Sequence, residues 1–157
     1  MSDNGPRHGA QHRERIGADS MSAYEKLLPD TLDGSKPFWD ACRRHELTIQ
    51  ECLECGHRRW PIGPACTHCL STDFSWVGVA GTGEVWSWIT YHQAFNSAWA
   101  ADVPYNVALI RMDEGHTMIS NIVGVTPDEI RIGQRVEVLF EDVTDEASVP
   151  KFRPVKP

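Results

Sequence analysis

Four cysteines in this chain form two C-x-x-C pairs, with ten residues between the pairs. They are Cys52, Cys55, Cys66 and Cys69. Each pair can make a tight turn that directs two sulfurs at one point, and the intervening loop can fold back to bring the turns together. Gly56 follows the first pair and can adopt the positive φ that such turns often require. The pattern therefore predicts a tetrahedral metal site with these four cysteines as ligands.

A metal held by four protein thiolates has no open coordination position, so we expect a structural rather than a catalytic ion. We expect Zn²⁺, but rubredoxin-type iron also uses four cysteines, and spacing alone does not distinguish the two metals. His57 and His68 lie inside or beside the two turns and could replace a cysteine. Because four cysteines already complete the coordination sphere, we expect both histidines to be exposed or hydrogen-bonded instead.

The composition is that of an ordinary globular protein. The chain has 157 residues, of which 41% are hydrophobic and 24% are charged, which suits one compact domain or two small ones. No apolar run approaches the roughly 20 residues that a membrane span requires, so we expect no membrane association. Residues 1–20 are polar and charged, without the apolar region of a signal peptide. We therefore expect a cytoplasmic protein, in which disulfides between these cysteines would rarely persist.

The formal net charge of −7 is concentrated in the second half of the chain. Residues 70–157 carry six Lys/Arg against twelve Asp/Glu, and no Lys or Arg lies between Arg59 and Arg111. Non-specific binding to nucleic acid depends on clustered positive charge, so this balance argues against it. A nucleic-acid-binding protein nevertheless remains an alternative, because Trp86, Trp88 and Trp99 could stack on bases.

A short helix and two strands are expected to position the cysteines. The helix is predicted to begin near Ser35, a possible N-cap, with Pro37 in the first turn. Phe38 and Cys42 share one face of this helix, and we expect Cys42 to be a small buried hydrophobe rather than a reactive thiol. Residues 47–51 alternate as a strand entering the first turn, and residues 58–60 form the strand leaving it. This order of strands and cysteine turns is that of a zinc ribbon.

From residue 74 onward the pattern is that of β-strands throughout. Strands are predicted at residues 74–79, 84–91, 105–111, 117–123 and 135–141, with a helical turn at 126–130. In the second of these strands the alternation predicts two faces, one with Val85, Ser87, Ile89 and Tyr91 and the other with Trp86, Trp88 and Thr90. Residues 148–155 are interrupted by prolines and are expected to run extended across the surface. These elements predict a small closed barrel of OB type, with a sandwich as the alternative.

The fold class expected overall is mainly β with an N-terminal helix. Four segments are predicted: a disordered tail at 1–22, an N-terminal helical segment at 23–46, a zinc ribbon at 47–71 and an OB-fold domain at 72–157. The longest break in the barrel, residues 92–104, carries Phe95 and Trp99 where a plain connector would be polar. Connections of this length are often functional, although the two aromatic rings could equally fold back over the barrel mouth.

Several short motifs, in this order, resemble the DUF35 family. They are Phe38-Trp39-Asp40 on the leading helix, Leu47-x-Ile-Gln50, the two cysteine pairs, Gly81-Thr-Gly83 with Val85 and Ser87, Pro104-Tyr105, Asp113-Glu-Gly115, Ile132-Gly133 with Val136, and Pro150-Lys-Phe152. The resemblance covers roughly residues 30–154. Paired cysteines alone are common in proteins, whereas their order with the barrel motifs is specific.

The resemblance implies a rubredoxin-like zinc ribbon followed by an OB-fold, in an accessory acyl-CoA-associated protein without a catalytic residue of its own. Family members are typically assembled with thiolase-like enzymes, and some with MaoC-type hydratases or aldolases. The resemblance thus implies a hetero-oligomer with a thiolase-like partner first and a hydratase or aldolase second. Cys52, Cys55, Cys66 and Cys69 match the family's metal ligands. No nucleophile elbow or phosphate-cradling loop is visible, which agrees with a non-catalytic role.

If the chain contacts CoA or its partner directly, we expect a limited set of residues to do so. Guanidinium groups can fork onto phosphate oxygens, although arginines in an acidic chain equally pair with carboxylates. The arginines concerned are Arg43, Arg44, Arg58 and Arg59, and Phe95 and Trp99 are the expected apolar contacts. A rubredoxin-like electron carrier is a further alternative, and it would require iron in the cysteine site.

Overall fold

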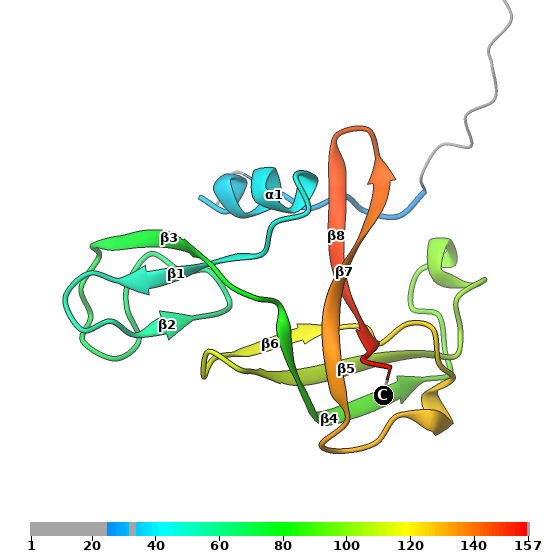
Figure 1. Cartoon of the computed structure of the whole chain (residues 1–157). Helices are drawn as coiled ribbons and strands as arrows, with labels where there is room; N and C mark the ends of the chain where they lie inside the picture. The colour runs from blue at the N-terminus through cyan, green and yellow to red at the C-terminus, as the bar shows by residue number, and fades with distance from the viewer. Residues whose placement is uncertain (1–24, 32–33, 157) are drawn as a thin grey trace, which may run out of the picture.

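The computed structural model describes residues 25–31 and 34–156, which form one α-helix followed by two antiparallel sheets (Figure 1). The predicted tail at 1–22 lies outside the described residues, and the four predicted segment boundaries stay predictions. The architecture is mainly β, as expected, with a ribbon of strands preceding a nearly closed barrel. Among the described residues, no helix has the length and hydropathy needed to cross a membrane.

Helix α1 spans Lys36–Arg43 and buries Phe38, Ala41 and Cys42. Ser35 occupies the N-cap position, but its hydroxyl donates to the backbone oxygen of Asp30 at 3.0 Å instead of capping the helix. Cys42 is fully buried, and desolvation raises the pKa of its thiol to about 12. The prediction of Cys42 as a buried hydrophobe is confirmed by this burial, and the raised pKa favours the protonated thiol at neutral pH.

The first sheet has three strands in the order β2-β1-β3. Strand β1 spans Thr48–Cys52, β2 spans Arg58–Arg59 and β3 spans Phe74–Gly78. The sequence predicts β3 as part of the barrel half, but β3 pairs along the whole of β1, with Ile49 opposite Val77. The difference arises because periodicity shows that a segment is a strand and carries no information about its partner.

The second sheet has five strands in the order β6-β5-β4-β7-β8. Their bounds are Thr82–Tyr91 for β4, Tyr105–Met112 for β5, Thr117–Ser120 for β6, Arg135–Thr144 for β7 and Ala147–Pro154 for β8. Two short 3₁₀ helices, η1 (Ser97–Trp99) and η2 (Pro127–Glu129), lie in the connections. A parallel bridge between Ile122 and Phe152 joins the two ends of the sheet, which makes the barrel nearly closed.

The sequence predicts only an extended surface segment at residues 148–155, and this prediction is wrong because the segment forms strand β8. It pairs with β7 from Ala147 to Pro154, and Phe152 is fully buried in the core. Pro150 and Pro154 are tolerated because β8 is last in the strand order, where a missing N–H leaves few ladder bonds unmade. The β7–β8 hairpin reaches α1, as Figure 1 shows.

The predicted two faces of β4 are correct only up to Val85, which is fully buried. A β-bulge between Val85 and Ser87 shifts the pairing by one residue. As a result Trp88 packs against the core, whereas Ile89 is 54% exposed. A bulge inserts one residue and exchanges the faces of everything after it, so strict alternation could not locate it.

The passage from the ribbon to the barrel requires two glycines. Gly81 has φ +74°, and a Cβ there would lie 2.3 Å from Cγ1 of Val138. A Cβ on Gly83 would lie 2.5 Å from the backbone oxygen of Arg111. The Gly-Thr-Gly motif therefore lets β4 approach β5 and β7 closely. Helix α1, the residue before β1 and the barrel share one hydrophobic core, to which α1 contributes Phe38 and Cys42 and the residue before β1 is Leu47.

Candidate metal centre

The first cysteine turn begins where β1 ends, at Cys52. Gly56 adopts φ +68° directly after Cys55, and its amide donates to the backbone oxygen of Cys52 at 2.9 Å. The amide of Cys52 donates in turn to the backbone oxygen of His57 at 3.0 Å. The positive φ expected at Gly56 is thus present, and it closes the turn so that both thiols project to the same side.

The second turn repeats this geometry. Leu70 follows Cys69 with φ +64°, and its amide donates to the backbone oxygen of Cys66 at 3.0 Å. The amide of Cys66 donates to the backbone oxygen of Ser71 at 2.8 Å. A non-glycine residue rarely adopts this conformation, so the turn at Leu70 is held at a local cost. Because position 70 is a leucine and not a glycine, the sequence did not predict a positive φ at this turn.

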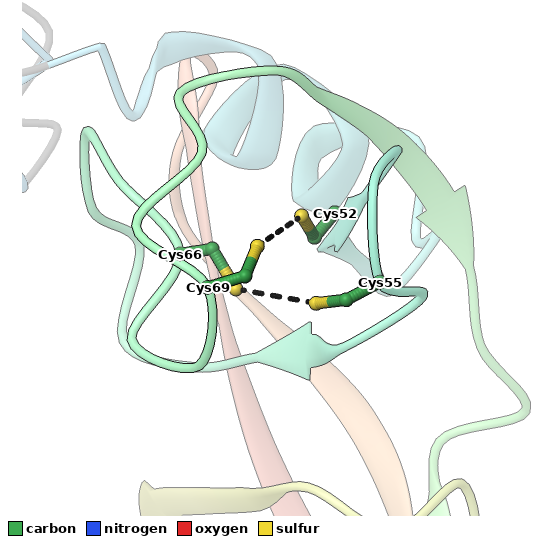
Figure 2. Close-up of side chains that lie close together, drawn as sticks. All are labelled: Cys52, Cys55, Cys66 and Cys69. Carbon is green, nitrogen blue, oxygen red and sulfur yellow. Dashed lines mark hydrogen bonds between the residues drawn. The ribbon is translucent and has the colours of Figure 1, made fainter.

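The two turns bring all four sulfurs together, as Figure 2 shows. The Sγ atoms of Cys52 and Cys69 are 3.5 Å apart, those of Cys55 and Cys66 are 3.7 Å apart, and all four lie within 4.8 Å of one another. A tetrahedral zinc ion with Zn–S bonds of about 2.3 Å sets its sulfurs about 3.8 Å apart. The four thiols therefore fit a single tetrahedral ion.

The close approach of the four thiols shifts their pKa values in opposite directions. At Cys66, burial opposes ionisation, but amide hydrogen bonds from Cys69 and His68 and the neighbouring thiols lower the pKa to about 6. At Cys55, the amide of His57 favours the thiolate, yet burial and the three other sulfurs raise the pKa to about 12. Four thiolates this close repel one another without a cation, and a divalent ion removes that repulsion.

The two histidines stand beside the cluster without joining it. The only metal-ligand group found among the described residues consists of the four cysteines. The rings of His57 and His68 stack with their centroids 5.3 Å apart, and Nε2 of His57 lies 3.5 Å from Oγ1 of Thr67. These positions agree with the expectation that neither histidine is a ligand.

The expectation that Arg59 offers a guanidinium to CoA phosphates is not supported by its position. Arg59 is only 4% exposed, and its Nε donates to Oε1 of Gln50 at 2.8 Å. Its Nη2 donates to the backbone oxygen of Gly63 at 3.0 Å, and the guanidinium lies over the ring of Phe74. The amide of Gly63 completes the network by donating to the same oxygen of Gln50 at 3.1 Å. Arg59 therefore holds the loop between the two cysteine turns.

The other three candidate arginines are more exposed. Arg58 pairs with Glu51 at 2.6 Å, and Arg44 pairs with Glu46 at 3.0 Å. Arg43 is exposed in the last turn of α1. Arg58 and Arg44 thus follow the alternative of pairing with nearby carboxylates. Their contact with CoA stays a prediction, as does that of Arg43.

The loop at 92–104 is organised around stacked aromatic rings. Tyr91 and Tyr105 stack with centroids 5.1 Å apart, and Trp99 packs on Tyr105 at 5.5 Å. Phe95 contacts Tyr91 edge-on at 5.8 Å and is 75% exposed. The Nζ atom of Lys26 lies 4.6 Å from the centre of the Trp99 ring. Trp99 thus folds back on the barrel, whereas Phe95 projects into solvent.

The tryptophans proposed for base stacking do not form one exposed platform. Trp88 packs against the core, and Trp99 is occupied by Tyr105 and Lys26. Trp86 is 49% exposed and has the guanidinium of Arg111 over its ring. A row of exposed rings, which single-stranded nucleic acid requires, is therefore not present among these three residues.

Two family models match the chain in succession. The first, described as the rubredoxin-like zinc ribbon domain of ChsH2, matches residues 39–75. The second, described as the C-terminal OB-fold domain of ChsH2, matches residues 76–141. The order of the two matches is the order of the cysteine ribbon and the barrel in the structure.

Three proteins are similar to this chain in sequence. A probable enoyl-CoA hydratase alpha subunit of Thermomonospora curvata is 40% identical over 127 residues, covering 80% of this chain and 39% of that protein. The 3-oxo-4,17-pregnadiene-20-carboxyl-CoA hydratase alpha subunit of Mycobacterium tuberculosis is 28% identical, and the match covers 81% of this chain and 40% of that protein. A DUF35 domain-containing scaffold protein of Methanothermobacter thermautotrophicus is 30% identical, and the match covers 66% of this chain and 78% of that protein. The chain thus spans about two fifths of the two hydratase subunits.

Two solved structures are similar in fold. A chain of the Ltp2-ChsH2(DUF35) aldolase has a TM-score of 0.68 and 38% identity, covering 76% of this chain and 93% of that one. A DUF35-family protein of unknown function from Sulfolobus solfataricus has a TM-score of 0.52 and 16% identity, and the match covers 76% of this chain and 84% of that one. The second supports the fold alone.

Proposed function

Because this chain belongs to the DUF35 family, we propose that it is an accessory, non-catalytic subunit of an acyl-CoA-processing complex. Its partner is a hydratase- or aldolase-type enzyme subunit. The main support for this proposal is the 38% identity to a chain of the Ltp2-ChsH2(DUF35) aldolase, in a match that covers 93% of that chain. The names of the two hydratase alpha subunits favour the same class of partner. A thiolase-like partner, which the resemblance put first, receives no such support from these relatives and becomes the second choice.

The metal in this subunit is zinc, and its role is structural. The distances among the four sulfurs suit a tetrahedral ion, and the ribbon corresponds to a family model described as a zinc ribbon. Cys52, Cys55, Cys66 and Cys69 would hold the ion, which supplies charge neutralisation and cross-linking of the two turns. With four cysteine ligands no coordination position is left for a substrate, which supports placing the catalytic chemistry in the partner.

Any contribution of this chain to CoA binding takes place in the assembled complex. Arg43 and Arg44 are exposed next to each other at the end of α1, where a phosphate could reach both guanidinium groups. Replacing both with alanine should weaken acyl-CoA binding to the complex by at least about tenfold, since even one charge-assisted hydrogen bond contributes about 1.5–3 kcal/mol. Arg153→Ala is the control, because Arg153 is exposed and paired with a carboxylate as Arg44 is, but lies on β8 and not at the end of α1. Equal affinities in all three proteins would contradict a role for the helix arginines.

Co-expression tests the proposed function directly. The chain is produced with a hydratase or aldolase subunit encoded beside it, and the complex is isolated by a tag on one subunit and characterised by light scattering. We expect a stable hetero-oligomer, with catalytic activity in the complex and none in this chain alone. Failure to bind either class of enzyme, or measurable hydratase or aldolase activity of the isolated chain, would overturn the proposal.

A further inference from the structure

The outer side of the barrel carries an uncharged apolar face on three neighbouring strands. In the β4–β5 register Ile89 lies opposite Val107, and in the β5–β6 register Leu109 lies opposite Ile119. Residues opposite each other in a sheet point to the same side, so these four side chains are neighbours on one surface. We call the surface formed by Ile89, Val107, Leu109 and Ile119 the β4–β6 face.

Two open grooves meet on the β4–β6 face. One has a volume of about 200 Å³ and includes Trp88, Ile89 and Leu109 in its lining. The other, of about 300 Å³, runs toward α1 and the ribbon and includes Trp39, Trp60 and Trp99. Both grooves are lined by Val107 and Ile119. The face is therefore continuous from the middle of β4 to the junction of the helix, the ribbon and the barrel.

Much of this apolar surface remains in contact with water. Ile89 is 54% exposed and Ile119 is 63% exposed. At the edge of the face Tyr91 stacks on Tyr105 and carries the exposed ring of Phe95. The outward positions of this part of β4 and β5 include no charged residue. They are Ser87, Ile89 and Tyr91 on β4 and Tyr105, Val107 and Leu109 on β5. A protein could therefore cover the face without burying an unpaired charge. The cores of protein interfaces are likewise apolar and poor in charged residues.

The shape of the face favours a protein over a small molecule as the occupant. Small-molecule sites bury most of their ligand in a closed cavity, whereas both grooves here are open to solvent. An exposed apolar surface with two adjoining open grooves suits a protein that inserts a few side chains as anchors.

The charge of the chain favours a different protein over a second copy of itself. The formal net charge is −7, so two copies brought face to face would repel each other. A partner that presents an apolar patch in a neutral or basic surrounding meets no such penalty. We propose that the β4–β6 face, with Phe95 at its edge, is the docking surface for the enzyme subunit of the complex. This inference rests on the proposed function and adds the surface through which the two subunits meet.

Charged substitutions of the two exposed isoleucines test the surface. Ile89→Asp, Ile119→Asp and the double variant are compared with wild type for binding to the purified hydratase or aldolase subunit by calorimetry. We expect each single variant to bind about 10- to 100-fold more weakly and the double variant more weakly still, because each substitution removes a buried isoleucine and puts a carboxylate in its place. Ile132→Asp is the matched control, since Ile132 is 72% exposed and lines neither groove. Its affinity should stay within about twofold of wild type.

The possible outcomes separate the surface from the proposed function. If wild type binds the enzyme subunit and the double variant binds equally tightly while retaining wild-type circular dichroism, the β4–β6 face is not the docking surface. If wild type binds neither class of enzyme, the proposed function itself fails. Sedimentation of the chain alone covers the remaining occupant: we expect a monomer, and a dimer that Ile119→Asp dissociates would assign the face to self-association and overturn the inference.

Discussion

Nε of Arg59 donates a hydrogen bond to Oε1 of Gln50 at 2.8 Å, and both side chains are almost completely buried on paired strands of the ribbon. The same oxygen accepts the amide of Gly63, so one buried amide side chain ties strand β2 to the loop between the cysteine turns. A charged group at 4% exposure is expensive to bury unless its hydrogen bonds are made. Nε and Nη2 of Arg59 have such partners, whereas Nη1 has none among the described residues, and the two bonds that are made link β1, β2 and the loop at Gly63.

Arg59→Ala should destabilise the protein by about 2–4 kcal/mol, because it leaves the buried Gln50 side chain with fewer partners and opens a cavity beside Phe74. The neighbouring Arg58→Ala is the matched control. Arg58 lies on the same strand but forms a partly exposed ion pair with Glu51, which contributes about 1 kcal/mol or less. Urea unfolding of the metal-loaded proteins measures both free energies. Equal losses for the two variants would contradict the structural role of Arg59.

Metal analysis of the purified protein should find one ion per chain, bound by the four cysteines. Zinc leaves the protein colourless, whereas iron in the same site would produce visible absorption and revive the electron-carrier alternative. Cys69→Ser should lower the metal content, because a hydroxyl is a poor ligand for zinc at neutral pH.

Removing the metal should loosen the ribbon and spare the barrel. Strands β1 to β3 depend on the cross-link between the cysteine turns, whereas β4 to β8 are held by their own strand pairing and supply most of the residues of the shared hydrophobic core. Hydrogen exchange after chelation should therefore show lost protection at residues 48–78 and retained protection at residues 82–154. Uniform loss across the chain would mean that the metal stabilises the whole fold.

His116 should make stability depend on pH. It is 6% exposed, both ring nitrogens lack a hydrogen-bond partner among the described residues, and desolvation lowers its pKa below 6.5, with Glu114 opposing this effect and Arg58 adding to it. A histidine that binds its proton more weakly in the folded than in the unfolded state costs stability once the unfolded state becomes protonated. Stability attributable to His116 should therefore fall as the pH drops below about 6.5.

Thermal melts across pH 5 to 8, a range of about three units around the usual histidine pKa, measure this dependence. His116→Leu should flatten the acid side of the profile, since leucine cannot bind the proton. His92→Leu is the control, because His92 is exposed in the loop after β4. A profile that His116→Leu leaves unchanged would assign the acid sensitivity to other groups.

Gly81→Ala should destabilise the protein by about 2–4 kcal/mol. The substitution forces a side chain onto a residue with φ +74° and sets its Cβ 2.3 Å from Cγ1 of Val138. Gly78→Ala is the control, since Gly78 has an ordinary φ and no atom within 4 Å of the position that a Cβ would occupy. Gly78→Ala should stay within about 0.5 kcal/mol of wild type. Urea unfolding distinguishes them, and a neutral Gly81→Ala would mean that the passage between ribbon and barrel can relax.

Local sequence was sufficient wherever the deciding contacts are close along the chain. A C-x-x-C turn is closed by backbone hydrogen bonds that span four or five residues, so the spacing of the cysteines predicted the sulfur cluster. The strands of the barrel were predicted for a similar reason, because alternation reports which side of a strand faces the core.

Tertiary structure alone decided which distant segments meet. The pairing of β3 with β1 and of β8 with β7 depends on contacts between strands and leaves no periodic mark within either segment. The bulge after Val85 exposed Ile89 and turned Trp88 inward, although the residues themselves alternate without interruption. Arg59 and Arg58 are adjacent and chemically identical, but their side chains lie on opposite sides of β2, one against Gln50 and one toward Glu51. Sequence therefore determined that a four-thiol site and a barrel exist, and folding decided which side chains are buried and which stay exposed.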